Sequence, residues 1–409
     1  MTRTQQELET LSTFSDAPAP AVTRVVFSEQ DLRARAWLKG LAEDAGLSIR
    51  EDAVGNTFLR WQGTDPAAPA VATGSHIDAI PHAGRYDGTV GVLGGLEAIR
   101  SLQAAGFRPR RSIELIHFTS EEPTRFGLGC LGSRLMSGVL PASADETLRD
   151  AEGASLRAVR NKAGFLGDLA STRVAPGAYH AFVELHIEQG PLLERRKVPI
   201  GIVTAIAAPA SERITIEGQG GHAGAVLMPD RHDAFLAAAE IALALETSAK
   251  STGAIDSVAT TGVCDIHPRA INSIPSRVIL EADIRDTDSA RRDRMIEKLE
   301  EACRTVAARR GVRIAREEIN RDTPATCDPG IIETIAEVCE THHVAFDRMV
   351  SRAYHDSLFM AKICPTSMIF VPCKNGFSHR PDEHAASEDI STGVKILAGT
   401  LAKLANEAG

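Results

Sequence analysis

Residues 69–105 read PAVATGSHIDAIPHAGRYDGTVGVLGGLEAIRSLQAA, and this stretch predicts the fold of the chain. Its first five residues, 69–73, form a short apolar run that predicts a buried strand. The glycine-rich, apolar residues 89–105 predict a buried helix, and residues 111–119 predict the next strand. A strand, a helix and a strand in succession are typical of a mostly parallel sheet covered by helices, so we expect an α/β fold.

The elements on either side extend this pattern. Residues 28–45 place apolar side chains on one helical face, and Gly46 can end that helix. Residues 181–187 predict a strand with His186 near its end. Three later elements are expected, a helix, a strand and a helix, over residues 329–341, 367–371 and 388–405. We expect them to rejoin the first sheet, which gives a discontinuous domain of residues 1–207 and 325–409.

The intervening residues 208–324 predict an inserted domain. Its expected elements follow the order β, α, β, β, α, β, over residues 213–217, 229–250, 256–263, 277–285, 288–310 and 312–317. That order is the ferredoxin-like arrangement. No regular structure is predicted for residues 142–177.

Composition excludes several classes of function. The chain has 409 residues, 43% of them hydrophobic, and a net charge of −9. No Lys/Arg-rich run is present, so we expect no nucleic-acid binding. No apolar stretch is long enough to span a membrane, and the polar N-terminus does not resemble a secretory signal. Seven cysteines without paired spacing are typical of reduced thiols, so we expect a cytoplasmic protein.

Imidazole and carboxylate side chains gather in four short segments at predicted strand ends and turns. These segments are GSHIDAIPHAGRYDG (74–88), FTSEEPTRFG (118–127), ELHIEQG (184–190) and NGFSHRP (375–381). Active sites of open α/β sheets lie at the carboxyl ends of strands. A mixed set of nitrogen and oxygen ligands suits Zn²⁺, Mn²⁺ or a similar divalent ion.

Each of these residues also has an ordinary interpretation. His76 alone could be a hydrogen-bonded turn residue, but Asp78 could support it, because ligating histidines usually hand their other N–H to a carboxylate. Asp87 could be a plain turn residue. Adjacent glutamates are usually solvated, yet Glu121 and Glu122 follow an apolar strand and precede a proline. Their joint occurrence favours a metal site.

These motifs resemble a known family. The succession His-x-Asp, Tyr-Asp-Gly, Glu-Glu, His-Ile-Glu-Gln-Gly-Pro and Ser-His-x-Pro is similar to the amidohydrolase branch of the di-metal aminoacylase and carboxypeptidase-like enzymes. That branch contains N-carbamoyl-L-amino acid hydrolases, allantoate amidohydrolases and ureidoglycolate amidohydrolases. The resemblance covers nearly the whole chain. His186 favours the ureido-cleaving branch, because peptidases of the wider group usually have Asp or Glu at that position.

The resemblance implies a role for each residue of the motifs. It implies two divalent metal ions, Mn²⁺ or Zn²⁺, bridged by Asp87. The other ligands would be His76 and His186 for one ion, and Glu122 and His379 for the other. Glu121 would be the general base, a role that suits a carboxylate beside a ligand.

The inserted domain is expected, by the same resemblance, to act as a lid and dimerisation domain in a homodimer. The family residue that matches His222 helps to stabilise the transition state, commonly across the dimer interface; the alternative is a turn histidine without a role. Asn272 and Arg285 match residues that hold a substrate carboxylate, and the guanidinium of Arg285 suits that pairing. The alternative for Arg285 is an ion pair with Asp283 or Asp286. Gln189 is expected to contact substrate.

The narrowest resemblance is to the ureidoglycolate amidohydrolases. It is carried by residues 201–211, 220–229, 270–276, 351–361 and 401–405. Tyr354 and His355 stand where the other branches tend to have Gly-His, and both are expected at the substrate. The implied reaction converts (S)-ureidoglycolate to glyoxylate, ammonia and carbon dioxide. The alternatives are an N-carbamoyl-L-amino acid hydrolase, an allantoate amidohydrolase, or a non-catalytic metal-binding relative.

Overall fold

The computed structural model describes residues 2–407, which form two compact units. The inserted unit is Ala205–Ala325 together with Arg352–Tyr354, and the rest of the described chain forms the larger unit. The inserted unit therefore starts three residues before the predicted boundary of 208. It also includes a three-residue segment, Arg352–Tyr354, which the prediction assigned to the larger domain.

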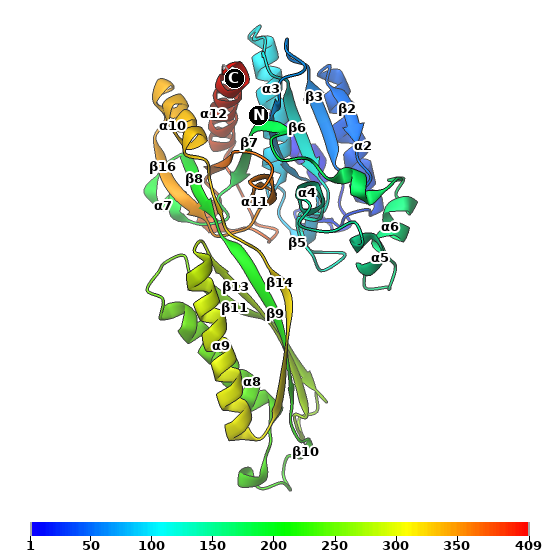
Figure 1. Ribbon diagram of the computed structural model, residues 1–409, viewed down its shortest axis with the longest axis vertical. Coiled ribbons are helices and arrows are strands. Elements are labelled where there is room, and N and C mark those ends of the chain that lie inside the picture. Colours follow the sequence, from blue (N-terminus) through cyan, green and yellow to red (C-terminus); the bar gives the residue numbers. More distant parts are fainter. Residues whose placement is uncertain (1, 408–409) are drawn as a thin grey trace. The chain divides into compact units, whose positions relative to one another are not determined.

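The larger unit contains a twisted sheet (Figure 1). Across the sheet the strands are β15 (Ala325–Thr326), β8 (Ile200–Ile206), β17 (Thr366–Val371), β7 (Tyr179–Ile187), β4 (Ala70–His76), β6 (Ile113–Phe118), β3 (Thr57–Trp61) and β2 (Ser48–Glu51). A further strand, β16 (Phe346–Ser351), pairs with β8. The central strands β17, β7, β4 and β6 are parallel, and β3, β2 and β8 are antiparallel to their neighbours. This confirms the expected α/β fold with a mostly parallel sheet.

Glycine explains how closely one helix approaches this sheet. On one face the helices α3 (Thr89–Ala104), α12 (Ser387–Asn406) and α10 (Pro329–Thr341) pack against the strands. A Cβ atom at Gly91 of α3 would lie 2.4 Å from the Leu185 carbonyl oxygen of β7. The glycine-rich sequence therefore lets the α3 backbone lie directly on the sheet.

The remaining elements of the larger unit are shorter or peripheral. Its other face carries α4 (Leu131–Ser137) and α11 (Ser357–Met360). Around the sheet lie α1 (Arg3–Ser12), β1 (Val22–Arg24), α2 (Glu29–Asp44), β5 (Ala79–Ala83) and α7 (Leu192–Arg196). Residues 142–177 contain the short helices α5 (Ala144–Thr147) and α6 (Leu156–Lys162), which the buried Arg160–Asp145 ion pair joins at 2.7 Å. Among residues 2–407, no helix is both long and apolar enough to cross a bilayer.

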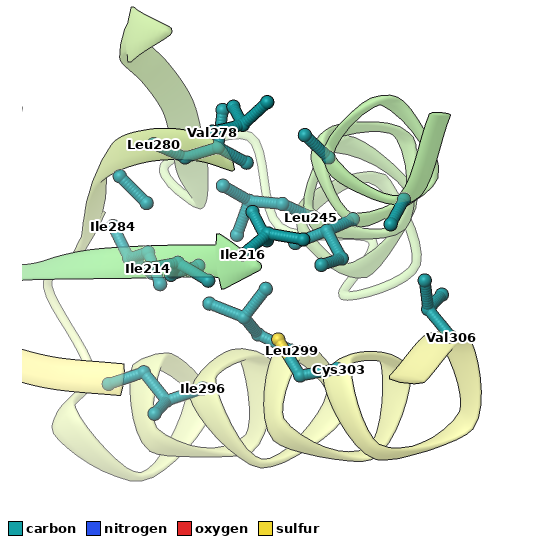
Figure 2. Packing of buried hydrophobic residues seen from close by; sticks show 14 of the residues in the cluster. Ile214, Ile216, Leu245, Val278, Leu280, Ile284, Ile296, Leu299, Cys303 and Val306 are labelled. Carbon is teal, nitrogen blue, oxygen red and sulfur yellow. The ribbon is translucent and has the colours of Figure 1, made fainter. Parts of the chain in front are cut away.

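The inserted unit has its own antiparallel sheet and core. Its elements are β9 (Ala208–Glu217), α8 (Ala234–Lys250), β11 (Val258–His267), β13 (Arg277–Asp286), α9 (Ser289–Arg310) and β14 (Arg313–Arg321). The sheet order is β11-β13-β9-β14, and both helices pack on one face (Figure 2). Alternate residues of β9, Ile214 and Ile216, meet Leu245 of α8 and Leu299 of α9 in that core. A separate ribbon, β10 (Gly221–His222) with β12 (Ser273–Ile274), extends from it.

Candidate metal centre

The predicted ligands meet at the carboxyl edge of the parallel strands. The strands β4 and β7 pair in parallel up to Thr73 and Val183, and beyond that point the rings of His76 and His186 lie 6.1 Å apart. Glu122 follows the end of β6, and His379 follows the end of β17. The turn between β5 and α3 supplies Asp87. Side chains that are far apart in sequence thus come together because parallel strands end at one edge.

Asp87 lies between two groups of potential ligand atoms. Its Oδ1 is 3.6 Å from His76 Nε2 and 3.2 Å from His186 Nε2. Its Oδ2 is 3.2 Å from His379 Nε2, which also lies 3.2 Å from Glu122 Oε1. In each group, three ligand atoms lie within 4.8 Å of one another. The two oxygens of Asp87 therefore face different groups.

The histidine tautomers suit metal binding. Nδ1 of His76 lies 3.0 Å from the Asp78 carbonyl oxygen, and Nδ1 of His186 lies 2.9 Å from the Ile187 carbonyl oxygen. Each Nδ1 can therefore carry the proton and donate a hydrogen bond to that carbonyl oxygen. The other ring nitrogen, Nε2, then keeps its lone pair. Both Nε2 atoms face Asp87. These residues fit a divalent metal ion in donor type and orientation.

The charges of the site also favour a cation. Burial alone would raise the pKa of Asp87, but the rings of His186, His379 and His76 hold it well below its usual range. In return, Asp87 and Glu122 raise the pKa of His379 to about 11. Positive charge is therefore stabilised between these carboxylates.

Glu121 lies at the edge of the first group. Its Oε2 is 3.6 Å from His76 Nε2, and its Oε1 accepts a hydrogen bond from the Cys130 thiol at 3.6 Å. Burial raises the pKa of Glu121 well above its usual range. A buried carboxylate with high proton affinity, close to the ligands, has the properties of a general base.

Asp78 supports the site in a way that the sequence did not predict. Its carboxylate lies 3.6 Å from His76 Nδ1, farther than the Asp78 backbone carbonyl. Instead, its two oxygens accept the backbone N–H groups of Glu121 and Glu122, at 3.2 and 3.1 Å. Burial raises the pKa of Asp78 to about 6. This side chain therefore holds the turn that carries Glu121 and Glu122, the predicted base and a predicted ligand.

His355, expected at the substrate, is buried against His186. Its ring centroid lies 4.5 Å from that of His186, and its Nε2 lies 3.0 Å from Ser351 Oγ. Only 2% of the residue is exposed. With Glu184 and His186 it forms a third group of possible ligand atoms within 4.8 Å. The Glu184 oxygens, however, accept hydrogen bonds from the hydroxyls of Ser75 and Ser357, at 2.7 and 2.5 Å.

Gln189 lies beside the bridging position. Its Nε2 donates a hydrogen bond to Asp87 Oδ2 at 2.6 Å, and its backbone has a φ of 53°. A left-handed backbone conformation is uncommon for residues other than glycine or asparagine. It directs the Gln189 amide to Asp87, the carboxylate that the two groups of possible ligand atoms share.

The inserted unit holds the other predicted substrate residues at two separate places. His222 and Asn272 adjoin, since the Ala223 N–H donates to the Asn272 carbonyl at 2.9 Å, and both residues are exposed. They lie beyond the Arg277 end of β13, whereas Arg285 is near the other end. Eight strand residues span about 26 Å. One copy of this unit therefore separates His222 from Arg285 by more than the length of a small substrate.

Arg285 forms an ion pair with Asp283, which was one of the alternatives to substrate binding. Its Nε and Nη2 donate to the two oxygens of Asp283, at 2.7 and 3.0 Å. The guanidinium also lies 5.3 Å from the centre of the Tyr354 ring. The structure therefore brings Arg285 and Tyr354 together.

Several residues of the site were not predicted. Ser378 and Glu383 flank His379 and contact the Asp87 segment. Glu184 shares a strand face with His186, so the period-two pattern of β7 could have indicated it. The thiol of Cys130 could not be foreseen, because its contact with Glu121 depends on the fold of the 120–130 loop.

The chain matches a known family over most of its length. The model described as peptidase family M20/M25/M40 matches residues 72–403. The ureidoglycolate hydrolase of Arabidopsis thaliana is 53% identical over 407 residues, which cover 98% of this chain and 86% of that protein. The N-carbamoyl-L-amino acid amidohydrolase of Geobacillus stearothermophilus is 38% identical, over 98% of this chain and 98% of that protein.

Solved structures are similar over the same length. The crystal structure of AtUAH in complex with (S)-hydroxyglycine is 52% identical, with a TM-score of 0.93, and covers 99% of this chain and 97% of that chain. A hydantoinase/carbamoylase family amidase from Burkholderia vietnamiensis is 34% identical, with a TM-score of 0.92, over 99% of this chain and 97% of that chain.

Proposed function

We propose, from the premise that this chain belongs to peptidase family M20/M25/M40, that it is a metal-dependent amidohydrolase of (S)-ureidoglycolate. The reaction would cleave the ureido C–N bond and give glyoxylate, ammonia and carbon dioxide. Two observations support this activity: the 53% identity to a ureidoglycolate hydrolase over 98% of this chain, and the ligand groups on both sides of Asp87. The identity carries the proposed substrate, and the ligand groups support metal-dependent hydrolysis, because attack on a ureido carbonyl needs an activated water.

We propose that the centre holds two divalent ions, Mn²⁺ or Zn²⁺. His76 and His186 would hold one ion, Glu122 and His379 the other, and Asp87 would bridge them. Such a pair supplies Lewis acidity, lowers the pKa of a water and stabilises the charge that develops on the attacked carbonyl oxygen. Imidazole and carboxylate donors accept either metal.

Glu121 performs the proton transfers in the proposed mechanism. Its Oε2 takes a proton from the attacking water, and the Cys130 thiol and the Asp78-bound backbone hold the carboxylate in place. The same oxygen then returns that proton to the leaving nitrogen, so that ammonia departs.

Arg285 is proposed to bind the substrate carboxylate. Its guanidinium has five N–H donors, and Asp283 occupies the fork formed by Nε and Nη2. A planar guanidinium suits bidentate pairing with a carboxylate, and the Tyr354 ring lies beside it. Gln189 is proposed to contact the substrate from the metal side, and its amide hydrogen bond to Asp87 supports this role.

We propose that the active form is a homodimer in which His222 and Asn272 serve the partner's centre. The support is the separation of these residues from Arg285 along β13. Co-expression of His222→Ala and Glu121→Gln chains tests this arrangement. If His222 acts across subunits, mixed dimers contain one intact site and regain activity that neither parent variant has. Mixed dimers as inactive as both parents would refute it.

A substrate panel tests the activity itself. Ammonia release is measured for (S)-ureidoglycolate, allantoate and an N-carbamoyl-L-amino acid, each with Mn²⁺-loaded and Zn²⁺-loaded protein. We expect the highest kcat/KM with ureidoglycolate. Faster turnover of a carbamoyl amino acid would favour the N-carbamoyl-L-amino acid hydrolases, which are also similar to this chain. The cytoplasmic location remains a prediction from composition.

A further inference from the structure

Glu383 is a buried glutamate four residues after His379. Only 4% of it is exposed. Its Oε1 accepts the backbone N–H groups of Tyr86 and Asp87, at 2.7 and 3.2 Å. Its Oε2 accepts the hydroxyl of Ser378 at 2.9 Å. Burying a carboxylate is costly unless it is hydrogen-bonded, and here every bond leads to a segment that carries a proposed ligand.

We propose that Glu383 is a positioning residue that holds Asp87 and His379 at the spacing needed to share one metal ion. The inference rests on the proposed ligand set. Glu383 itself touches neither the substrate nor the metal. It acts through the backbone of Asp87 and through Ser378, the residue before His379.

The segment that carries His379 depends on such an anchor. The side chain of His379 is 47% exposed, and its backbone has a φ of 59°. A strained, exposed loop does not by itself fix a ligand to the accuracy that a metal requires. The loop is closed at its base by the Lys374 N–H, which donates to the His384 carbonyl at 2.8 Å. Glu383 lies at that base and joins it to the Asp87 turn.

Gly84 makes the close approach of these two segments possible. A Cβ atom at Gly84 would lie 2.3 Å from the Cβ of Glu383. The glycine therefore leaves the space that brings the Glu383 carboxylate within hydrogen-bond distance of the Tyr86 and Asp87 amides. The turn that carries the bridging ligand and the base of the His379 loop are thus fitted to each other.

Ser378 links the anchor to the ligand oxygen. Its hydroxyl lies 2.7 Å from Asp87 Oδ2 and 2.9 Å from Glu383 Oε2. A hydroxyl has one proton, so it can donate to only one of these carboxylates at a time. When a metal ion binds Asp87 Oδ2, the hydroxyl can donate to Glu383 instead. Glu383 thereby lets the Ser378 hydroxyl leave the ligand oxygen without becoming unpaired, while Gln189 still donates to that oxygen.

The test is metal affinity, measured without substrate. Metal-free wild type, Glu383→Gln, Ser378→Ala and Asp150→Asn are titrated with Mn²⁺ and Zn²⁺ by calorimetry. Asp150 is the control, because its carboxylate also accepts two backbone N–H groups, those of Glu152 and Ala154, and its contact with the 118–127 segment is with the Arg125 side chain at 3.4 Å, not with the turn that carries Glu121 and Glu122. We expect Glu383→Gln to weaken binding by about 10- to 100-fold, and Asp150→Asn to leave it unchanged.

Three results would overturn the proposal. The first is wild-type metal affinity in a folded Glu383→Gln protein. The second is an equal loss in Asp150→Asn, which would indicate a general loss of stability. If Glu383→Gln does not fold, unchanged metal affinity in Ser378→Ala overturns it. Because no substrate is present, a wrong substrate assignment would leave these titrations unaffected.

Discussion

At the scale of single residues, Gly88 shows how tightly the centre is built. It has a φ of 65°, and its N–H donates to His186 Nε2 at 3.1 Å. A Cβ atom there would lie 2.3 Å from His76 Nε2. Both histidines of the first ligand group are therefore packed against a residue that must lack a side chain.

Gly88→Ala should therefore weaken metal binding. Gly46 is the matched control, because its φ is 69° but nothing lies within 4 Å of its Cβ position. We expect Gly46→Ala to cost about 1–2 kcal/mol of unfolding free energy through backbone strain alone. Gly88→Ala should in addition lower metal affinity by about tenfold or more, measured by calorimetry. Equal metal affinity in the two variants would contradict this reading of the turn.

Glu121→Gln tests the proposed general base. The amide keeps the size of the side chain but cannot take a proton from water. We expect kcat to fall by about 10²–10⁴-fold, while the metal content stays that of the wild type. Turnover is followed by ammonia release, and metal content by elemental analysis. Wild-type turnover in the metal-loaded variant would exclude Glu121 as the base.

The sequence could predict the residues whose type and spacing carry chemistry. His76, Asp87 and His186 stand in motifs, and the structure brings them to one edge. The sequence could not predict the role of Glu383. Asp382 and Glu383 are adjacent acids in one loop, and only burial distinguishes them. Nor could it predict that His355 would be buried, since that depends on the packing of its ring on His186.

At the scale of elements, prediction succeeded where local signals were strong. The helix expected at residues 329–341 is α10, Pro329–Thr341, which begins with an Asp328 cap and a proline in its first turn. The helices within residues 142–177 were missed, because α5 and α6 are shorter than the window in which periodicity can be recognised. Their positions depend on tertiary contacts such as the Arg160–Asp145 pair.

The contact between α3 and β7 gives a prediction at this scale. In Gly91→Ala, the new methyl group would meet the Leu185 carbonyl, so α3 must move away from the sheet. We expect a loss of about 1–3 kcal/mol in unfolding free energy, measured by urea denaturation. Gly40→Ala in α2 is the control, because its Cβ position is open. It should stabilise the protein by about 0.5–1 kcal/mol. Equal effects of both changes would contradict close packing of α3.

At the scale of the molecule, all the proposed metal ligands belong to the larger unit. The inserted unit has a separate core, formed by β9, β13, α8 and α9. Ligand binding stabilises the parts of a protein that are ordered with the ligand. Metal removal should therefore loosen the larger unit and leave the inserted core unaffected.

Hydrogen exchange, followed by mass spectrometry with and without a chelator, measures this difference. After metal removal we expect faster exchange in residues 84–90, 119–124 and 374–384. We expect unchanged exchange in α8 and α9. Faster exchange throughout the inserted core would contradict this prediction, because it would show that metal binding stabilises both units.

The most direct test of the central claim is anomalous diffraction from crystals of the Mn²⁺- or Zn²⁺-loaded protein, recorded at the metal's absorption edge. We expect two peaks, one on each side of Asp87. One should lie next to His76 and His186, and the other next to Glu122 and His379. A single peak, or a peak at Glu184 and His355 in place of these, would contradict it.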